Sequence, residues 1–182
     1  LHASADRRDF SKTLDWSLRL VFVIGLPSTI ALAILATPIL STLFEYGEFG
    51  SNDVYNASVA LIAYSIGLVG FMGIKVLAAG FYSREDMKTP VRVALIAMVV
   101  NLILNLSFVG IMGHAGLALA TSISALLNAV LLLRILVENN VLQLRSGWGL
   151  LAARVFVAGV ILGIVLWVLR DSPAELSYGS LS

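Results

Sequence analysis

Cysteine is absent from this chain of 182 residues, and charge is scarce, because only 13% of the residues are Asp, Glu, Lys or Arg. The lack of cysteine excludes disulfides and thiol chemistry. A net charge of +1 gives no general attraction to nucleic acid or to acidic partners, so we expect no nucleic-acid partner. Hydrophobic residues make up 59% of the chain and the mean hydropathy is +0.94, a composition that predicts a membrane protein.

Signatures of catalysis and of nucleotide binding are also absent. The sequence has no Walker lysine loop and no HExxH motif. The glycines of residues 67–73 lie within an apolar run and not in a strand-to-helix turn. We therefore expect a protein without enzymatic activity and without a cofactor, apart from the sodium ion considered below.

Long apolar runs are what the chain has in abundance. At about 1.5 Å of rise per residue, about 20 helical residues cross a hydrocarbon core of about 30 Å. Pro27 and Pro38 lie inside the first run, where each removes a backbone donor, so this span should be bent. We predict an all-α, polytopic membrane helix bundle over residues 17–169, with five spans at about 17–44, 54–82, 91–112, 117–137 and 150–169.

The two ends of the chain are polar. Residues 1–16 mix charges with Phe10, Leu14 and Trp16, which fits either a short amphipathic helix on the membrane surface or a frayed linker. Residues 170–182 are expected to form a periplasmic tail or loop.

The distribution of lysine and arginine predicts the orientation, because these residues concentrate on the cytoplasmic side of membrane proteins. One side of the predicted bundle carries a single basic residue, Arg170, and an acidic loop at 45–53. We therefore expect the chain start, the turn at 83–90 and the loop at 138–149 in the cytoplasm. The ten basic residues on that side are Arg7, Arg8, Lys12, Arg19, Arg84, Lys88, Arg92, Arg134, Arg145 and Arg154.

Residues 67–90, GLVGFMGIKVLAAGFYSREDMKTP, join two predicted spans through a tight charged turn. Within them, residues 75–84, Asp86 and residues 88–91 resemble a hallmark of the MurJ (MviN) lipid II flippases, which belong to the multidrug/oligosaccharidyl-lipid/polysaccharide exporter superfamily. Ala79 departs from the pattern, since relatives commonly have proline there. The resemblance extends over most of residues 17–150 through residues 38–50, 114–117, 127–129 and 147–148.

This resemblance implies a fourteen-span transporter of the bacterial inner membrane, of which the chain would be the C-terminal portion. It implies alternating access, a role in peptidoglycan and cell-wall biogenesis, and lipid II, the undecaprenyl-pyrophosphate-linked muropeptide, as substrate. The other implied partners are membrane lipids and the N-terminal spans of the same protein. A related polysaccharide-lipid or multidrug exporter is one alternative, and a noncatalytic membrane scaffold is another.

Lys75 is a charge inside the predicted second span, on the order of 10 Å below the turn. Its long stem could reach up to the cytoplasmic interface. Alternatively, the ammonium faces a water-filled cavity and binds an anionic lipid headgroup as a point charge. Before it, Gly67, Gly70 and Gly73 recur at a spacing of three, which predicts a helix face where another backbone approaches closely.

Asn101 and Asn105 are four residues apart and therefore share one face of the third span. Thr121, across the short turn at 113–116, should lie at a similar depth. These side chains could simply form interhelical hydrogen bonds. By resemblance, some MurJ proteins hold a sodium ion with side chains of the equivalent helices, including a carboxylate where this chain has Asn105. Asn101, Asn105 and Thr121 are therefore a candidate sodium site that lacks that charge.

Overall fold

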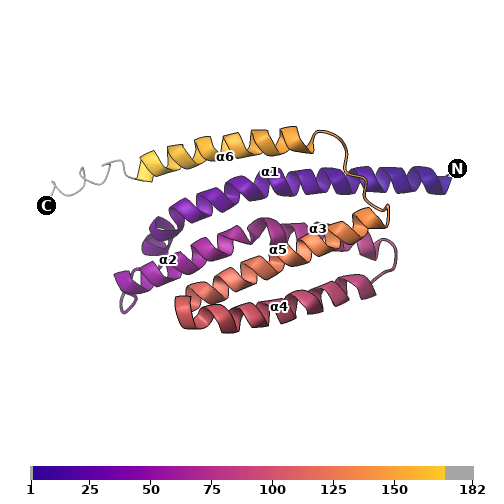
Figure 1. Cartoon of the computed structure of the whole chain (residues 1–182). Coiled ribbons are helices and arrows are strands. Elements are labelled where there is room, and N and C mark those ends of the chain that lie inside the picture. The colour runs from indigo at the N-terminus through magenta and orange to yellow at the C-terminus, as the bar shows by residue number, and fades with distance from the viewer. Residues whose placement is uncertain (1, 171–182) are drawn as a thin grey trace.

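The structure is a computed structural model that describes residues 2–170, with side chains described from Asp9 onward. This part of the chain is helical and has no strand, which confirms the predicted all-α membrane bundle. Five helical stretches are long and apolar enough to cross a membrane, α2 and α3 counting together as one. The helices, shown in Figure 1, are α1 (His2–Phe44), α2 (Ser51–Ile66), α3 (Leu68–Tyr82), α4 (Lys88–Met112), α5 (His114–Glu138) and α6 (Trp148–Arg170).

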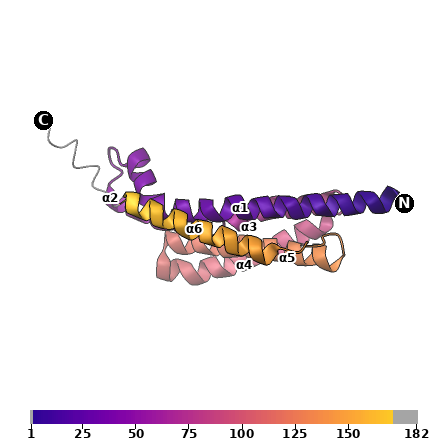
Figure 2. The same ribbon diagram turned by 90° about the horizontal axis from the view of Figure 1, so that it is seen from above.

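Helix α1 is continuous over 43 residues, so residues 2–16 extend the first span as a helix with no backbone break before residue 17. Pro27 and Pro38 both lie inside it. Figure 2 shows α1 running straight from its N-terminus and then bending near its C-terminal end, the part that contains Pro38. Because proline has no N–H, the carbonyl of Ile34 loses its usual helical partner. The predicted tail at 170–182 lies outside the described residues except for Arg170, the last residue of α6.

The expected second span is interrupted at Gly67, between α2 and α3, which the sequence did not predict. The N–H of Gly67 bonds the carbonyl of Tyr64, three residues back, which is a tighter turn than the α-helix makes. Hydroxyl groups of neighbouring helices bond nearby carbonyls, since Ser122 Oγ donates to Ala63 O at 2.7 Å and Thr29 Oγ1 donates to Ser65 O at 3.0 Å. The carbonyls beside the interruption therefore have hydrogen-bond donors from neighbouring helices.

Helix α5 packs against α2, α3 and α4, and α1 packs against α2, α3 and α6. Within the described bundle α6 packs on α1 alone, at the edge seen in Figure 1. Between α4 and α5 the turn is shorter than predicted, because Gly113 alone separates them. Its φ of 56° and ψ of −131° are readily adopted only by glycine. The two helices are the antiparallel neighbours that the short turn predicted.

The glycine face predicted on the second span packs against α5. A Cβ at Gly67 would lie 2.7 Å from the Cα of Ser122, and a Cβ at Gly70 would lie 2.9 Å from the backbone nitrogen of Leu126. Such distances leave no room for a side chain, so the predicted close approach is confirmed at Gly67 and Gly70. At Gly73, the third predicted position, a Cβ would meet only the Cβ of Ala129 at 3.7 Å, an ordinary contact, so the prediction is wrong there. Below this contact, nearer the 83–90 turn, a buried apolar cluster joins α1, α3, α4, α5 and the loop after α5 through Leu14, Leu18, Leu77, Phe81, Val93, Leu132, Leu136 and Leu142.

Candidate functional site

The predicted residues Asn101, Asn105 and Thr121 lie together between α4 and α5. Asn105 Nδ2 donates to Asn101 Oδ1 at 2.9 Å, and Asn101 Nδ2 donates to Thr121 Oγ1 at 3.3 Å. The same amide donates to Ser124 Oγ at 3.2 Å. The structure thus brings the three predicted residues into one hydrogen-bonded chain and adds Ser124 to it.

The direction of these hydrogen bonds leaves oxygen atoms without partners. The Thr121 and Ser124 hydroxyls donate to the carbonyls of Leu117 and Thr121, both at 2.9 Å, so their oxygens remain free to accept from Asn101. Asn105 Oδ1 and Asn128 Oδ1 are buried and have no hydrogen-bond partner in the described part of the chain. A buried acceptor without a partner costs about 1–3 kcal/mol, so each oxygen is suited to receive a donor or a cation.

A pocket of about 250 Å³ adjoins this polar chain. Asn101, Thr121, Ser124 and Asn128 contribute to its wall, together with apolar side chains of α3 and α4. Amide and hydroxyl oxygens suit a hard cation better than a soft transition metal. The described residues include no cluster of three His, Cys, Asp or Glu side chains that could hold a metal. Among the described residues, the polar groups in the pocket wall are neutral amides and hydroxyls, so a cation here would meet neutral ligands from this part of the chain.

Lys75 lies on the side of α3 that faces away from the packed core. It is exposed, as are Ala79 and Tyr82 at the following turns of the helix, whereas Leu77 and Ala78 are buried. Among the described residues no carboxylate lies within 4.0 Å of its ammonium group. The packing of α1 and α5 against α3 thus leaves this charge on an open face of the bundle.

Side chains of the charged turn after α3 form local hydrogen bonds at the start of α4. Asp86 Oδ1 accepts from the backbone N–H groups of Lys88 and Thr89 at 3.1 Å, and the Thr89 hydroxyl donates to Asp86 Oδ2 at 2.6 Å. These bonds cap the start of α4, and the Thr89 side chain contributes most to lowering the pKa of Asp86. Helix capping therefore explains Asp86 and Thr89, whereas Lys88 takes part only through its backbone N–H.

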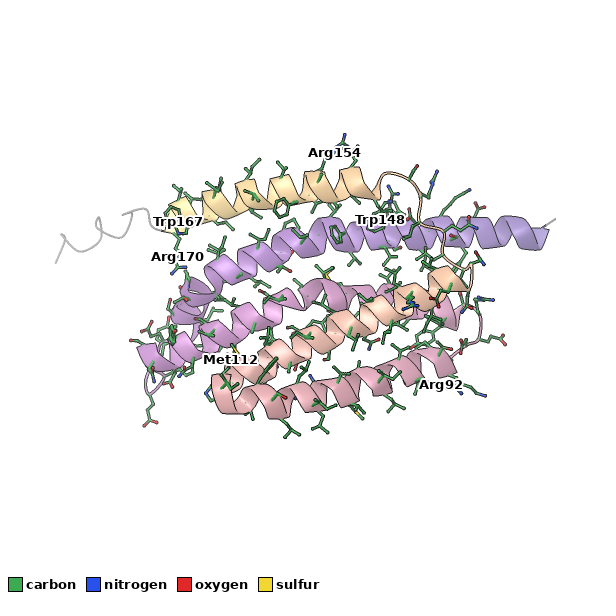
Figure 3. The ribbon with its side chains drawn as sticks, in the orientation of Figure 1. Arg92, Met112, Trp148, Arg154, Trp167 and Arg170 are labelled. Carbon is green, nitrogen blue, oxygen red and sulfur yellow. The ribbon has the colours of Figure 1, made fainter. Side chains whose placement is uncertain are left out.

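Asp15 on α1 is the centre of a buried polar cluster that the sequence analysis missed. Only 2% of Asp15 is exposed. Its carboxylate accepts from Arg19 Nε at 2.9 Å, from Trp148 Nε1 at 2.8 Å and from the backbone N–H of Arg145 at 3.3 Å. Figure 3 shows Trp148 at the start of α6, beside α1. Asp15 therefore ties the start of α6 to α1.

Further contacts hold the loop before α6 against α1. The Arg19 guanidinium donates to the carbonyls of Arg145 at 3.2 Å and Ser146 at 3.3 Å and lies 5.5 Å from the centre of the Trp148 ring. Ser11 Oγ accepts from the N–H of Gln143 at 3.0 Å. Ser11, Asp15 and Arg19 recur at a spacing of four, which is the local signal of these contacts in the sequence. The groups that they contact in the loop and in α6 lie more than 120 residues away.

The sequence comparison that decides the family covers the whole chain. The family model described as "Lipid II flippase MurJ" matches residues 1–182. The chain belongs to the lipid II flippase MurJ family. This confirms the resemblance drawn from residues 67–90, and with the five long apolar helices it makes the chain part of a multi-pass membrane protein.

Individual relatives support the same assignment. The chain is 46% identical to the probable lipid II flippase MurJ of Vibrio cholerae, over 98% of this chain and 34% of the relative. It is 41% identical to the lipid II flippase MurJ of Burkholderia cenocepacia, over 91% of this chain and 32% of the relative. A solved structure, "Lipid II flippase MurJ, inward closed conformation", is 26% identical and matches with a TM-score of 0.73, over 93% of this chain and 40% of that one. The chain thus spans about a third of the length of these bacterial relatives.

Proposed function

We propose that this chain is the C-terminal part of a lipid II flippase, which moves lipid II across the bacterial inner membrane by alternating access. The observation that carries the proposal is the family match over every residue of the chain. The five apolar helices supply spans for such a transporter, and the relatives' names favour lipid II over the substrates of related exporters. The N-terminal spans of the same protein would complete the transport path.

In this proposal Lys75 faces the transport path and binds a phosphate group of the substrate. Its position on an open face of α3, with no acidic partner among the described residues, supports this role over that of a packing residue. An ammonium group inside a membrane span is costly unless it meets water or an anion. A pyrophosphate-linked lipid supplies such an anion.

Replacing Lys75 by alanine in the full-length protein should lower flippase activity by about 10–100-fold, the expected value of a charge-assisted hydrogen bond to phosphate. Lys75→Arg should retain more activity because it keeps the charge. The measurement is growth of a strain depleted of its own lipid II flippase, at matched protein levels. Lys88→Ala is the control, because only the backbone N–H of Lys88 takes part in capping α4.

Each outcome of this experiment bears on one proposal. If the parent protein fails to support growth, the flippase proposal fails. If the parent and Lys75→Ala support growth equally, the flippase proposal stands and Lys75 reaches to the interface instead. A noncatalytic scaffold would also tolerate Lys75→Ala, but it would not replace a depleted flippase.

We also propose that Asn101, Asn105 and Thr121 form part of a sodium site. The support is the hydrogen-bonded chain that joins them and the unpartnered oxygen of Asn105 at its end. The neutral ligands of this chain would bind sodium weakly, so a carboxylate from another span would complete the site. Asn101 would have to turn its amide over to present its oxygen to the cation, because its NH₂ group now faces Thr121 and Ser124.

Asn105→Asp should increase sodium-dependent transport, shifting the half-saturating sodium concentration about fivefold or more downward. A carboxylate about 4 Å from the ion adds on the order of 1–4 kcal/mol at dielectric values between those of water and a protein surface. Asn105→Leu should abolish the dependence while the protein stays folded. Ser107→Ala, on the same helix and outside the cluster, is the control. If transport does not depend on sodium in either the parent or Asn105→Asp, the three side chains serve only as hydrogen-bonding groups between helices.

We further propose that the start of the chain and the turn at 83–90 face the cytoplasm, as the ten-to-one distribution of basic residues indicates. Single cysteines at Ser51 and Met87, which are both exposed, should react from opposite sides in a cysteine-free version of the full protein. On intact cells with a permeable outer membrane, an impermeant thiol reagent should label Ser51→Cys and spare Met87→Cys. Labelling of Met87→Cys under these conditions would reverse the orientation.

A further inference from the structure

A groove lies between α1 and α6 at the end of the bundle opposite the Asp15 cluster. Its volume is about 420 Å³, and its walls include Pro38 and Ser41 of α1 and Leu166, Leu169 and Arg170 of α6. Helix α6 has 23 residues, which at about 1.5 Å each is slightly more than the thickness of the hydrocarbon core. Arg170, its last residue, therefore lies at the level of the lipid headgroups.

The guanidinium of Arg170 points into this groove. Figure 3 shows the side chain between the end of α6 and the bent part of α1, and Arg170 Nη1 donates to the carbonyl of Ile34 at 3.3 Å. This carbonyl is the one that Pro38, four residues later, leaves without a helical N–H donor. The kink in α1 thus orients the charged group inward, toward the other helix.

Most of the hydrogen-bonding capacity of Arg170 remains unused within the described chain. A guanidinium has five N–H donors, and the bond to Ile34 uses one of them. No carboxylate of the described residues lies within 4.0 Å of it. The two parallel donors of an arginine match a phosphate group, and Leu166 and Leu169 supply an apolar wall beside it.

We propose that this groove binds a phospholipid of the outer leaflet, with its phosphate on Arg170 and one acyl chain along the leucine side chains of α6. The site is separate from the open face that carries Lys75 and depends on the proposed orientation alone. Trp167 is 60% exposed and lies one turn before Arg170, as expected of an aromatic residue at the membrane interface.

Native mass spectrometry of the full-length protein, titrated with phosphatidylglycerol in detergent, tests this site. Arg170→Gln should weaken retention of one phosphatidylglycerol molecule by about tenfold, the effect expected for loss of a charge-assisted bond to phosphate. Ser41→Phe, which fills the groove and keeps the charge, should weaken it similarly. Arg154→Gln, at the other end of α6 where Figure 3 shows the side chain pointing away from α1, should retain lipid as the parent does.

Three results would overturn the proposal. Equal retention by the parent and Arg170→Gln would mean that the arginine holds no lipid, as would be found if another part of the protein fills the groove. Loss in Arg170→Gln but not in Ser41→Phe would mean that the charge attracts lipids without the groove. Equal loss in Arg154→Gln would mean that any arginine of α6 suffices. The readout is lipid retention and not transport, so its failure would leave the flippase proposal standing.

Discussion

Replacing Asp15 by alanine is expected to destabilise the protein by about 3–5 kcal/mol, the cost of removing one partner from a buried ion pair. Three donors would lose their common acceptor: the Arg19 side chain, the indole N–H of Trp148 and the backbone N–H of Arg145. Arg19 is 28% exposed and can regain some hydration, which favours the lower part of this range. The start of α6 would also lose its main polar attachment to α1.

Thermal unfolding of the purified full-length protein measures this effect. The melting temperature of Asp15→Asn should lie between those of the parent and Asp15→Ala. The amide oxygen still accepts from Trp148, but it carries no charge. Asp9→Ala is the matched control on the same helix, since Asp9 is 74% exposed and pairs only with exposed Lys12. Such surface pairs contribute little to stability. Similar melting temperatures for the Asp9 and Asp15 variants would contradict the assigned role of Asp15.

Replacing Gly70 by alanine is expected to cost about 1–3 kcal/mol, the usual penalty for forcing an extra carbon into a packed interface. The new Cβ would lie 2.9 Å from the nitrogen of Leu126 and 3.0 Å from the carbonyl carbon of Ala125. Both atoms are backbone, so no side chain can rotate away. Helices α3 and α5 would have to separate along their glycine contact.

Gly73→Ala provides the matched control for this prediction, one turn further along the same helix. Its Cβ would meet the Cβ of Ala129 at 3.7 Å, an ordinary contact. Alanine also stabilises a helix by up to about 1 kcal/mol relative to glycine. The melting temperature of this variant should therefore equal or exceed that of the parent. If both variants unfold at the same temperature, the close approach at Gly70 does not limit stability.

The candidate sodium site was predictable in part, because its signals are local. A spacing of four placed Asn101 and Asn105 on one face, and a short turn placed Thr121 opposite them at a similar depth. Ser124 joins through the same amide, and Asn128 adds an unpartnered oxygen beside the pocket. The spacing of residues predicts which side chains share a face of a helix. Which of them contact the neighbouring helix depends on the rotation of α4 relative to α5.

The sequence alone determined that the chain is a helical membrane bundle, where its apolar spans lie, that the second span packs closely through a glycine face and to which family the chain belongs. The first three properties depend on transfer to the bilayer and on helical spacing, both of which are local, and the family follows from the matching residues. Only the tertiary structure decided that Asp15 bonds the start of α6, that α2 and α3 part at Gly67, and that Arg170 points into a groove. Each of these depends on side chains or carbonyls from another helix. A polar group in the membrane must find such a partner, and hydropathy cannot say which helix supplies it.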